Sequence, residues 1–402
     1  MDFDFIKRIV KKNNSKIVLL VMDGLGGLPH EKYGLTELEK ANTPNLDELA
    51  KKSICGLQLP VGSGITPGSG PGHLGLFGYD PVKYQVGRGV LAANGIGFDL
   101  QSNDVAARGN FCTIDNEGRV TDRRAGRIST EKNKQLCEIL CEQIDICGLE
   151  VFVKPVKEHR FLLVLRGEGL SGDIIDTDPQ EIGKKPLQPK SLNPGNEKTI
   201  KLVSEFIKQA GEILHDEIPA NMVLLRGFSK TPKWPMFPEV YNVKSASIAA
   251  YPMYRGLAKL IGMDLLETGQ TIDEEFKTLE EKWDDYDFFF LHVKKTDSYG
   301  EDGNFESKVK VIEETDSLIP RLMKLSPDVV IITGDHSTPS NLKSHSWHPV
   351  PVLIFSKHCR ADNVLKFGER NCITGGLGPR LPAKELIPIA MANAQRLEKF
   401  GA

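Results

Sequence analysis

The sequence predicts an α/β protein with a mostly parallel sheet core and an inserted α+β domain. Two observations predict this fold class. Short apolar runs alternate with segments of helical periodicity in the first and last parts of the chain, which is typical of a parallel sheet covered by helices. The middle of the chain instead holds short strands, turns and many arginines, which indicates a separate α+β domain.

The first strand–loop–helix unit lies near the start of the chain. Residues 17–22, IVLLVM, form a continuous apolar run, and Asp23 follows it with three nearby glycines. A buried strand ending in a glycine loop is the simplest interpretation. The stretch NTPNLDELAKKS then predicts a helix with Thr43 as N-cap and Pro44 as its first residue.

The same pattern recurs in the last third of the chain. DYDFFFLHV, residues 285–293, predicts a buried strand that leads to Asp297, and FESKVKVIEETDSLIPRLMKL predicts an amphipathic helix. PDVVIITGDH and HPVPVLIFS predict two further strands. We therefore expect residues 1–79 and 231–402 to form one discontinuous core, and residues 80–230 to form the inserted domain.

Composition narrows the functional class. The 402 residues carry 51 Lys and Arg against 54 Asp and Glu, and this balance gives no general argument for nucleic acid as a partner. No run of apolar residues is long enough to span a membrane, and the N-terminus does not resemble a signal peptide. The seven cysteines form no C-x-x-C pair, so we expect reduced thiols and a cytoplasmic protein.

Three aspartates follow predicted strands. Asp23, Asp297 and Asp335 each come shortly after an apolar run, and the carboxyl ends of parallel strands share one edge of a sheet. A single aspartate there is usually a helix cap or a turn former. Three of them, with His336 and His345 nearby, indicate instead a site for hard or intermediate divalent cations such as Mn, Zn or Mg. Two cations would balance the charge better than one.

A glycine-rich loop is the candidate position of a nucleophile. GSGITPGSGPGHLGLFGYD, residues 62–80, holds Ser63, Thr66 and Ser69 and leads into HLGLFGYD, which looks like a helix start. A flexible linker is the alternative interpretation. A hydroxyl beside a metal ion would be acidified and become a nucleophile. Composition does not choose among the three hydroxyl residues.

Several motifs in order identify a family resemblance. VMDGLGG, TPGSGPGHLGLFGYDP, GRGVLAANGIG, RGNFCTID, DRRAGR, KTDSYGEDGNF, TGDHSTP and HSWHPVP together resemble the archaeal-type, cofactor-independent phosphoglycerate mutases of the alkaline phosphatase superfamily. The resemblance runs from about residue 16 to residue 390. It is specific as a set, although each motif alone is not.

The resemblance implies a catalytic core and an insert that closes over the substrate. In this family the serine of the G-S-G-P-G-H stretch carries the phosphoryl group, which selects Ser69. One metal group then resembles Asp23, Ser69, Asp335 and His336, and the other resembles Asp297, the residue four positions later, and His345. The resemblance implies two divalent metal ions, of which Mn suits the ligands best and Mg, Zn or Co are alternatives, and it implies no 2,3-bisphosphoglycerate.

The sequence departs from related enzymes at one of these positions. Phosphatase-like relatives often read Asp-x-x-x-His, whereas this chain reads Asp297-Ser-Tyr-Gly-Glu301. A carboxylate can replace an imidazole as a ligand and would favour harder cations. We expect Glu301 to be a ligand; weak binding of the second metal, or a Glu301 that turns away, is the alternative.

Basic residues of the insert are candidates for holding the substrate. Phosphoglycerate carries a phosphate and a carboxylate, and guanidinium groups bind both with paired hydrogen bonds. Arg124 and Arg127 are the first candidates. Surface arginines are ordinary, and many will be solvated or structural. The remaining substrate-binding candidates are Arg108, Asp122, His159, Arg160, Arg226 and Lys244.

The resemblance implies an isomerase that interconverts 3-phosphoglycerate and 2-phosphoglycerate through a phosphoserine, in glycolysis and gluconeogenesis. His159 or Asp122 would handle the hydroxyl proton. Two alternatives use the same residues. A metal-dependent phosphatase or phosphonate-processing enzyme would release phosphate to water, and an inactive metal-binding regulator would bind metal without turnover. The only partner expected is the small-molecule substrate, and the sequence does not predict the oligomeric state.

Overall fold

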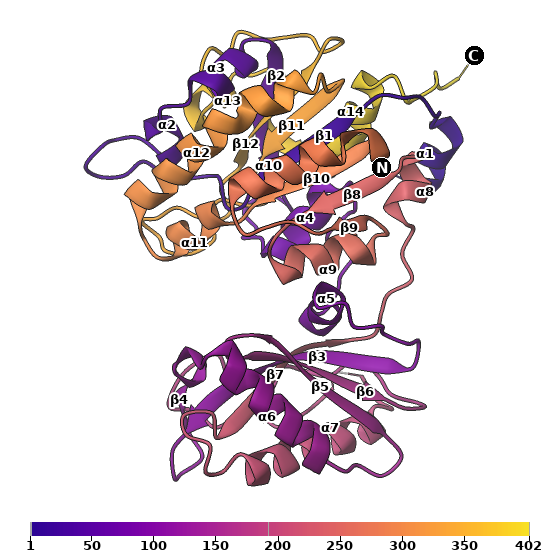
Figure 1. Cartoon of the computed structure of the whole chain (residues 1–402), viewed down its shortest axis with the longest axis vertical. Helices are drawn as coiled ribbons and strands as arrows, with labels where there is room; N and C mark the ends of the chain where they lie inside the picture. Colours follow the sequence, from indigo (N-terminus) through magenta and orange to yellow (C-terminus); the bar gives the residue numbers. More distant parts are fainter. Residues whose placement is uncertain (1, 192, 402) are drawn as a thin grey trace. The chain divides into compact units, whose positions relative to one another are not determined.

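The computed structural model describes residues 2–191 and 193–401 (Figure 1). The chain divides into two compact units. The core unit comprises Met1–Gln85, Trp234–Tyr251 and Ile261–Ala402, and the insert unit comprises Val86–Lys233 and Pro252–Leu260. The predicted boundaries fall a few residues earlier, and the sequence did not predict that residues 252–260 group with the insert unit. The roles predicted for the two units stay predictions.

A mostly parallel sheet forms the centre of the core unit (Figure 1). The strand order is β13-β2-β12-β11-β1-β10-β8-β9. The strands are β1 Ile17–Met22, β2 Ser53–Leu59, β8 Ser245–Ile248, β9 Asp264–Leu266, β10 Phe288–Val293, β11 Val329–Thr333, β12 Val350–Ser356 and β13 Gly378–Pro382. β1 lies between β10 and β11 and is parallel to both, whereas β12 runs antiparallel to β11 and β2. The predicted fold class is confirmed.

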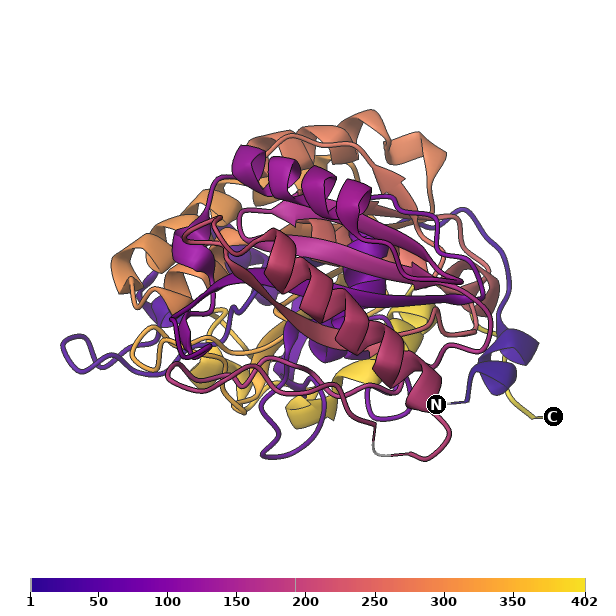
Figure 2. The same ribbon diagram turned by 90° about the horizontal axis from the view of Figure 1, so that it is seen from below.

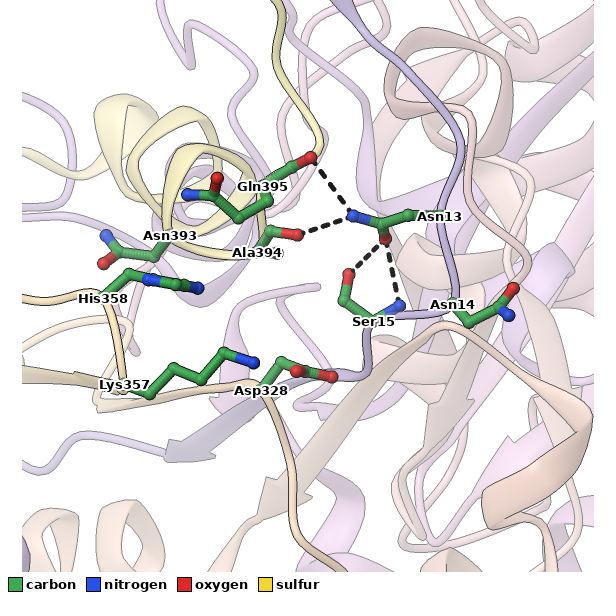
Figure 3. Close-up of a pocket in the computed structure, with 9 residues that line it drawn as sticks. All are labelled: Asn13, Asn14, Ser15, Asp328, Lys357, His358, Asn393, Ala394 and Gln395. Carbon is green, nitrogen blue, oxygen red and sulfur yellow. Dashed lines mark hydrogen bonds between the residues drawn. The ribbon is translucent and has the colours of Figure 1, made fainter.

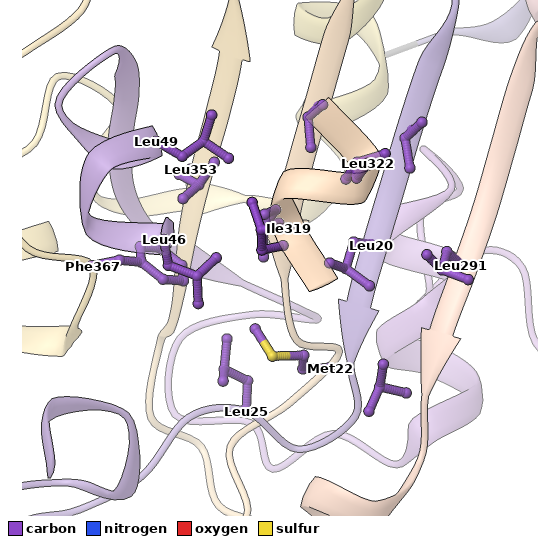
Figure 4. Packing of buried hydrophobic residues seen from close by; sticks show 14 of the residues in the cluster. Leu20, Met22, Leu25, Leu46, Leu49, Leu291, Ile319, Leu322, Leu353 and Phe367 are labelled. Carbon is purple, nitrogen blue, oxygen red and sulfur yellow. The ribbon is translucent and has the colours of Figure 1, made fainter. Parts of the chain in front are cut away.

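Helices cover both faces of this sheet. On one face, α3 (Pro44–Ala50), α10 (Ile272–Glu281) and α12 (Phe305–Lys324) bury leucine and isoleucine side chains against the strands, as Figure 4 shows for Leu46, Ile319 and Leu20. On the other face lie α4 (Ser69–Leu76), α8 (Phe237–Tyr241) and α14 (Leu386–Asn393). The remaining elements are α1 Phe3–Ile9, α2 Glu37–Lys40, α11 Lys295–Glu301, α13 Glu369–Cys372, η2 Trp283–Asp285 and η3 Ala383–Glu385.

The start of α3 differs in one respect from the prediction. Thr43 occupies the N-cap position and Pro44 is the first helical residue, but the Thr43 side chain makes no capping hydrogen bond. The carboxylate of Asp316, on α12, accepts the amide N–H of Leu46 at 2.7 Å instead. A residue far away in the sequence therefore caps this helix, and a local pattern could not reveal it.

An antiparallel sheet forms the centre of the insert unit. Its order is β4-β3-β6-β5, and β7 pairs with β3. The strands are β3 Asp104–Ile114, β4 Val120–Asp122, β5 Glu150–Lys157, β6 Arg160–Arg166 and β7 Met222–Ser229. Two long helices, α6 (Thr130–Gln143) and α7 (Glu197–Ile213), lie side by side on one face of this sheet (Figure 2).

The opposite face of this sheet carries α5 (Arg88–Gly95), which packs against α9 (Pro252–Leu260). Gly89 lets α5 approach the Ala106 carbonyl closely, because a side chain at this position would collide with that backbone group. A short 3₁₀ turn, η1 (Ala125–Arg127), follows β4. Within residues 2–191 and 193–401, no helix is long and apolar enough to cross a membrane.

Glu275 is a buried carboxyl group on the core-facing side of α10. Burial raises its pKa from 4.5 to about 8, although an amide hydrogen bond from Ala250 and the charge of Lys295 act in the opposite direction. The unfolded chain loses this proton near its ordinary pKa. The folded protein therefore holds a proton that the unfolded chain has lost between about pH 4.5 and pH 8, and stability falls as the pH rises through this window.

We predict that Glu275→Gln reduces this loss of stability. The pKa rises by about 3.5 units, from 4.5 to about 8, and each unit corresponds to about 1.4 kcal/mol, so the variant should exceed the wild type by roughly 4–5 kcal/mol in free energy of unfolding at pH 8. The two proteins should differ little near pH 4.5. Urea unfolding at several pH values checks this, with the exposed Glu281→Gln on the same helix as control. Parallel pH profiles for wild type and Glu275→Gln would contradict the assignment.

Candidate metal centre and active site

Three strands of the core sheet end side by side, and an aspartate follows each of them. Asp23 comes directly after β1, Asp335 comes two residues after β11, and Asp297 lies on α11 four residues after β10. Because β1 is parallel to both neighbours, all three side chains lie at the same edge of the sheet. All three are buried. The fold therefore concentrates negative charge away from water.

His336 is the centre of a first group of possible metal ligands. Its Nε2 atom lies 3.3 Å from Asp23 Oδ1, 3.2 Å from Asp335 Oδ2 and 3.2 Å from Ser69 Oγ. The two carboxylates and the imidazole are fully buried. The structure thus brings together the four residues predicted for one metal ion.

His345 belongs to a second group. Its Nε2 atom lies 3.5 Å from Asp297 Oδ1, and the ring stacks on that of His336 with centroids 3.6 Å apart. The donor atoms of Asp297, His345 and His336 lie close enough together to hold one ion. His336 is therefore shared between the two groups, which the sequence did not predict.

Glu301 lies beside the second group but outside its closest set of donor atoms. Its Oε1 atom is 3.8 Å from His345 Nε2, and its side chain is 57% exposed. Burial and the nearby Asp297 carboxylate raise the Glu301 pKa, although Lys294 and His345 act in the opposite direction. A rotation of this exposed side chain would bring its carboxylate to the group, so its role as a ligand stays a prediction.

The hydrogen bonds of His345 show which of its nitrogen atoms can bind a cation. Its Nδ1 atom lies 2.9 Å from the carbonyl oxygen of Pro67. A carbonyl oxygen only accepts, so Nδ1 carries a proton and donates it. The other nitrogen, Nε2, is the one that faces Asp297. This second contact of a metal-binding histidine is typical of metal sites, because it orients the ring.

Positive groups already gather around the carboxylates. Lys294 Nζ lies 2.9 Å from Asp23 Oδ2 and 2.5 Å from Asp297 Oδ2. Burial alone would raise the pKa of Asp23, but Lys294, His292 and His336 outweigh it and hold that pKa well below its usual range. At Asp297, burial and the nearby Asp23 carboxylate raise the pKa, but the hydrogen bond with His345 and the charge of Lys294 outweigh them, so the Asp297 pKa is lowered. Both carboxyl groups are thus ionised.

Two histidines respond to the same carboxylates. Burial lowers the pKa of His345, but Asp297 overcomes this effect and raises that pKa to about 9. Burial also opposes protonation of His73, yet Asp335, whose Oδ2 atom lies 3.0 Å from His73 Nδ1, raises its pKa. The carboxylates draw protons onto nearby rings because the site favours positive charge. Such a set of ionised oxygen and imidazole donors fits divalent cations.

Ser69 stands at the amino end of a helix inside this group. It is the first residue of α4, and its hydroxyl contacts His336. Ser63 and Thr66, the other two candidates in the loop, are exposed. The sequence predicted a helix start at His73, but the helix begins four residues earlier, at Ser69. Gly72 allows α4 to pack directly on the Asp335 carbonyl. Backbone N–H groups at such a helix start favour anions.

A buried lysine fastens the loops that carry the ligands. Lys308, on α12, is fully buried, and its Nζ atom donates to the carbonyl oxygens of Gly24, Gly26 and Thr338 at 2.9, 3.1 and 2.9 Å. Burial lowers its pKa, whereas Glu37, 3.9 Å away, favours the charged form. The loop after β1 and the loop after β11 are therefore held to each other through one ammonium group.

Sequence reasoning missed several contributors to this site. Two of them could have been recognised from their spacing in the sequence. Lys294 lies three residues before Asp297, and His73 lies four residues after Ser69, on the same face of that helix. Lys308 carried no such signal, because it looks like any lysine of an amphipathic helix.

In the insert unit, four arginines surround a buried histidine. Burial, together with the positive charges of Arg160, Arg124, Arg108 and Arg127, lowers the pKa of His159 to about 3. The ring is therefore neutral at physiological pH. The structure brings these five predicted residues into one positively charged group, which fits an anionic ligand.

Two other arginines of this unit are held by carboxylates. Arg123 forms paired hydrogen bonds with Asp178 at 2.9 and 2.8 Å. Arg226, a predicted substrate ligand, lies 3.2 Å from Asp176 and 3.5 Å from Asp178. Arg88 was not predicted; it is exposed, but it lies close enough to Arg226 and Asp176 to belong to the same cluster.

Asp122 shapes the turn that presents two of the arginines. Its carboxylate oxygens accept the amide N–H groups of Arg124 and Gly126, both at 2.7 Å. Ala125 and Arg127 have φ values of 47° and 54°, a left-handed conformation that is costly for residues with side chains. The carboxylate of Asp122 therefore stabilises a strained turn, and its predicted role in proton transfer stays a prediction.

Lys244 lies away from the metal ligands. It comes directly before β8, and β8 is parallel to β10, so Lys244 sits at the amino-terminal edge of the sheet. Its ammonium group lies 4.5 Å from the ring centroid of Tyr286. The structure does not bring this predicted substrate ligand to the site, because the lysine precedes its strand whereas the metal ligands follow theirs.

A surface pocket of about 310 Å³ also lies at the amino-terminal edge of the core sheet (Figure 3). Asn13 closes part of it by donating to the carbonyl oxygens of Ala394 and Gln395. Its lining combines the segment before β1, the residue before β11 and the residues after the antiparallel β12. The pocket is therefore separate from the metal ligands at the other edge. It is lined by Asn13, Asn14, Ser15, Asp328, Lys357, His358, Asn393, Ala394 and Gln395.

Comparison with known proteins identifies close relatives. Residues 50–221 match the family model of 2,3-bisphosphoglycerate-independent phosphoglycerate mutase. A protein of Aquifex aeolicus with the name "Probable 2,3-bisphosphoglycerate-independent phosphoglycerate mutase" is 55% identical over 99% of this chain and 100% of its own length. A protein of the same name from Thermotoga maritima is 54% identical over 99% of each chain.

Two solved structures resemble the chain over nearly its whole length. A protein from Pyrococcus horikoshii has a TM-score of 0.84 at 33% identity, over 97% of this chain and 100% of the other. The cofactor-independent phosphoglycerate mutase from Thermoplasma acidophilum has a TM-score of 0.70 at 30% identity, over 94% of this chain and 100% of its own.

We predict that Glu301→Ala weakens the second metal group. The substitution removes a carboxylate beside His345 and leaves Asp297, His345 and His336 as the remaining donors of that group. The Mn content after dialysis should fall from two ions per chain towards one, as measured by elemental analysis. Asp302→Ala, which removes the neighbouring exposed carboxylate, is the matched control. Two tightly held ions in Glu301→Ala would remove Glu301 from the ligand set.

Proposed function

Because the chain belongs to the 2,3-bisphosphoglycerate-independent phosphoglycerate mutases, we propose that it interconverts 3-phosphoglycerate and 2-phosphoglycerate through a phosphoserine at Ser69. The observation that carries this proposal is the position of the Ser69 hydroxyl, 3.2 Å from His336 Nε2 and at the first residue of α4. No other hydroxyl among the three loop candidates has such surroundings in the described part of the chain. The enzyme is then a glycolytic isomerase, and we place it in the cytoplasm.

Divalent cations are proposed as the cofactors. Asp23, Asp335, His336 and Ser69 would hold one ion, and Asp297, His345 and Glu301 would hold the other. The donors are mostly carboxylate oxygens with imidazole nitrogens, which favours Mn, with Mg, Zn and Co as alternatives. When bound, the ions would supply positive charge that lowers the pKa of the attacking hydroxyl and stabilises the transferring phosphoryl group. No 2,3-bisphosphoglycerate is required, because Ser69 itself carries the phosphoryl group between the two positions.

The protein groups around Ser69 have separate tasks. The amino end of α4 offers backbone N–H groups to the phosphoryl oxygens as the Ser69 oxygen attacks phosphorus. Lys294, which contacts both Asp23 and Asp297, keeps a fixed positive charge between the two ligand groups. Lys308 holds the two ligand loops in place and stays away from the reacting atoms. These tasks are positioning and charge stabilisation, which dominate phosphoryl transfer.

The basic group of the insert unit is proposed to hold the substrate. Arg124, Arg127, Arg108 and Arg160 surround the neutral His159, so a carboxylate or phosphate would find several guanidinium donors. The neutral ring of His159 is the proposed acceptor for the proton of a glycerate hydroxyl, and a bound anion would offset the arginine charges that make this ring a weak base. Arg226 contributes less to binding, because Asp176 and Asp178 already neutralise it.

We predict that Ser69→Ala abolishes isomerisation, by ~10³-fold or more, because the phosphoryl group loses its carrier. The assay uses 3-phosphoglycerate and Mn without 2,3-bisphosphoglycerate and follows 2-phosphoglycerate and free phosphate together. Wild type should give the isomer with little phosphate. Release of phosphate without isomer would identify a hydrolase instead.

The matched control is Ser63→Ala, which removes an exposed hydroxyl from the same loop and should leave the rate unchanged. Far-ultraviolet circular dichroism checks that Ser69→Ala is folded. A folded Ser69→Ala enzyme that retains mutase activity would refute the phosphoserine.

A further inference from the structure

Thr338 lies between the two groups of metal ligands. Its side chain is fully buried, and its Oγ1 atom is 2.7 Å from Asp297 Oδ1 and 2.9 Å from His336 Nδ1. Asp297 belongs to the second group, and His336 is shared by both. A single hydroxyl therefore contacts a ligand of each group. It meets His336 at Nδ1, which lies on the opposite side of the ring from the possible ligand atom, Nε2.

The direction of these hydrogen bonds follows from simple chemistry. The ionised carboxylate of Asp297 can only accept a hydrogen bond, so the single hydroxyl proton of Thr338 points to it. The lone pairs of Thr338 Oγ1 then remain for His336 Nδ1, which must donate. Nδ1 therefore carries the proton of the ring. The lone pair of Nε2 is directed to Asp23, Asp335 and Ser69.

We propose that Thr338 is a positioning residue: its hydroxyl fixes the tautomer of His336 and the orientation of Asp297, and thereby couples the two metal groups. This inference rests on the proposed metal function of the site. Without the hydroxyl, the His336 ring could carry its proton on Nε2, where it would block a cation. Asp297 would lose the donor that holds its carboxylate in one orientation. Groups that orient metal ligands in this way typically change metal affinity by roughly 10–100-fold.

The backbone around Thr338 leaves its side chain little freedom. Its N–H group donates to the Gly26 carbonyl at 2.9 Å, and its own carbonyl accepts from Lys308 at 2.9 Å. Gly24 and Gly300 lie against it so closely that a side chain at either position would collide with Thr338. Gly24 also has a φ of +63°, which favours glycine. Backbone hydrogen bonds and the close packing of Gly24 and Gly300 thus hold the Thr338 hydroxyl in one place, as a positioning role requires.

The first test is Thr338→Val, which keeps the shape of the side chain and removes the hydroxyl. Mn binding to the full chain, measured by titration calorimetry, should weaken by ~10–100-fold. Thr338→Ser keeps the hydroxyl and should restore most of the affinity. The matched control is Thr315→Val, because Thr315 is equally buried and its hydroxyl donates to the Val311 carbonyl of its own helix, away from the metal ligands. Unchanged affinity in Thr338→Val, or a Thr338→Ser protein as weak as Thr338→Val, would overturn the proposal.

A second measurement needs no cation and no variant. Long-range ¹H–¹⁵N correlation spectra of the metal-free wild-type chain report which nitrogen of each histidine carries the proton. The proposal requires a proton on Nδ1 of His336. A ring protonated on Nε2 alone would overturn it even if the valine variant did not fold. Failure of the proposed function is a different outcome, namely a wild-type protein that binds no Mn while His336 keeps its Nδ1 proton.

Discussion

The carboxylates of Asp23, Asp297 and Asp335 meet where β1, β10 and β11 end, and their mutual repulsion in a buried place must be balanced by positive charge. These strands are parallel neighbours, so all three end at the same edge of the sheet, and the residues that follow them lie close together there. The raised pKa values of His73 and His345 and the position of Lys294 are consequences of this concentration of charge. Divalent cations would neutralise the negative charge of the carboxylates more completely than protons on the histidines do.

The surrounding structure serves mainly to keep these groups in place. Lys308 ties the loop after β1 to the loop after β11, and Thr338 orients one ligand from each group. Both depend on glycines that let backbone segments touch, such as Gly24 against Thr338. Preorganisation of this kind suits a mutase, because the phosphoryl group must pass to and from Ser69 without a search for the right geometry.

Much of the core was predictable from sequence, because apolar runs locate the strands and each aspartate follows a strand within four residues. What the sequence could not give were pairings between distant residues. His336 lies within reach of both groups, since its ring stacks on that of His345, and this contact depends on how a loop returns. Asp316 replaces Thr43 as a cap, and Asp176 and Asp178 neutralise Arg226 from about fifty residues away. Lys244 was misplaced for a simpler reason, since it precedes its strand and so lies at the wrong edge.

Anomalous diffraction from crystals of the wild-type chain soaked in Mn tests the central claim most directly. The account predicts two ions at the carboxyl edge of the core sheet. One should bind Nε2 of His336 with Asp23 and Asp335, and the other should bind Nε2 of His345 with Asp297. Ions found elsewhere, or carboxylates balanced by Lys294 and protonated histidines at saturating Mn, would contradict it.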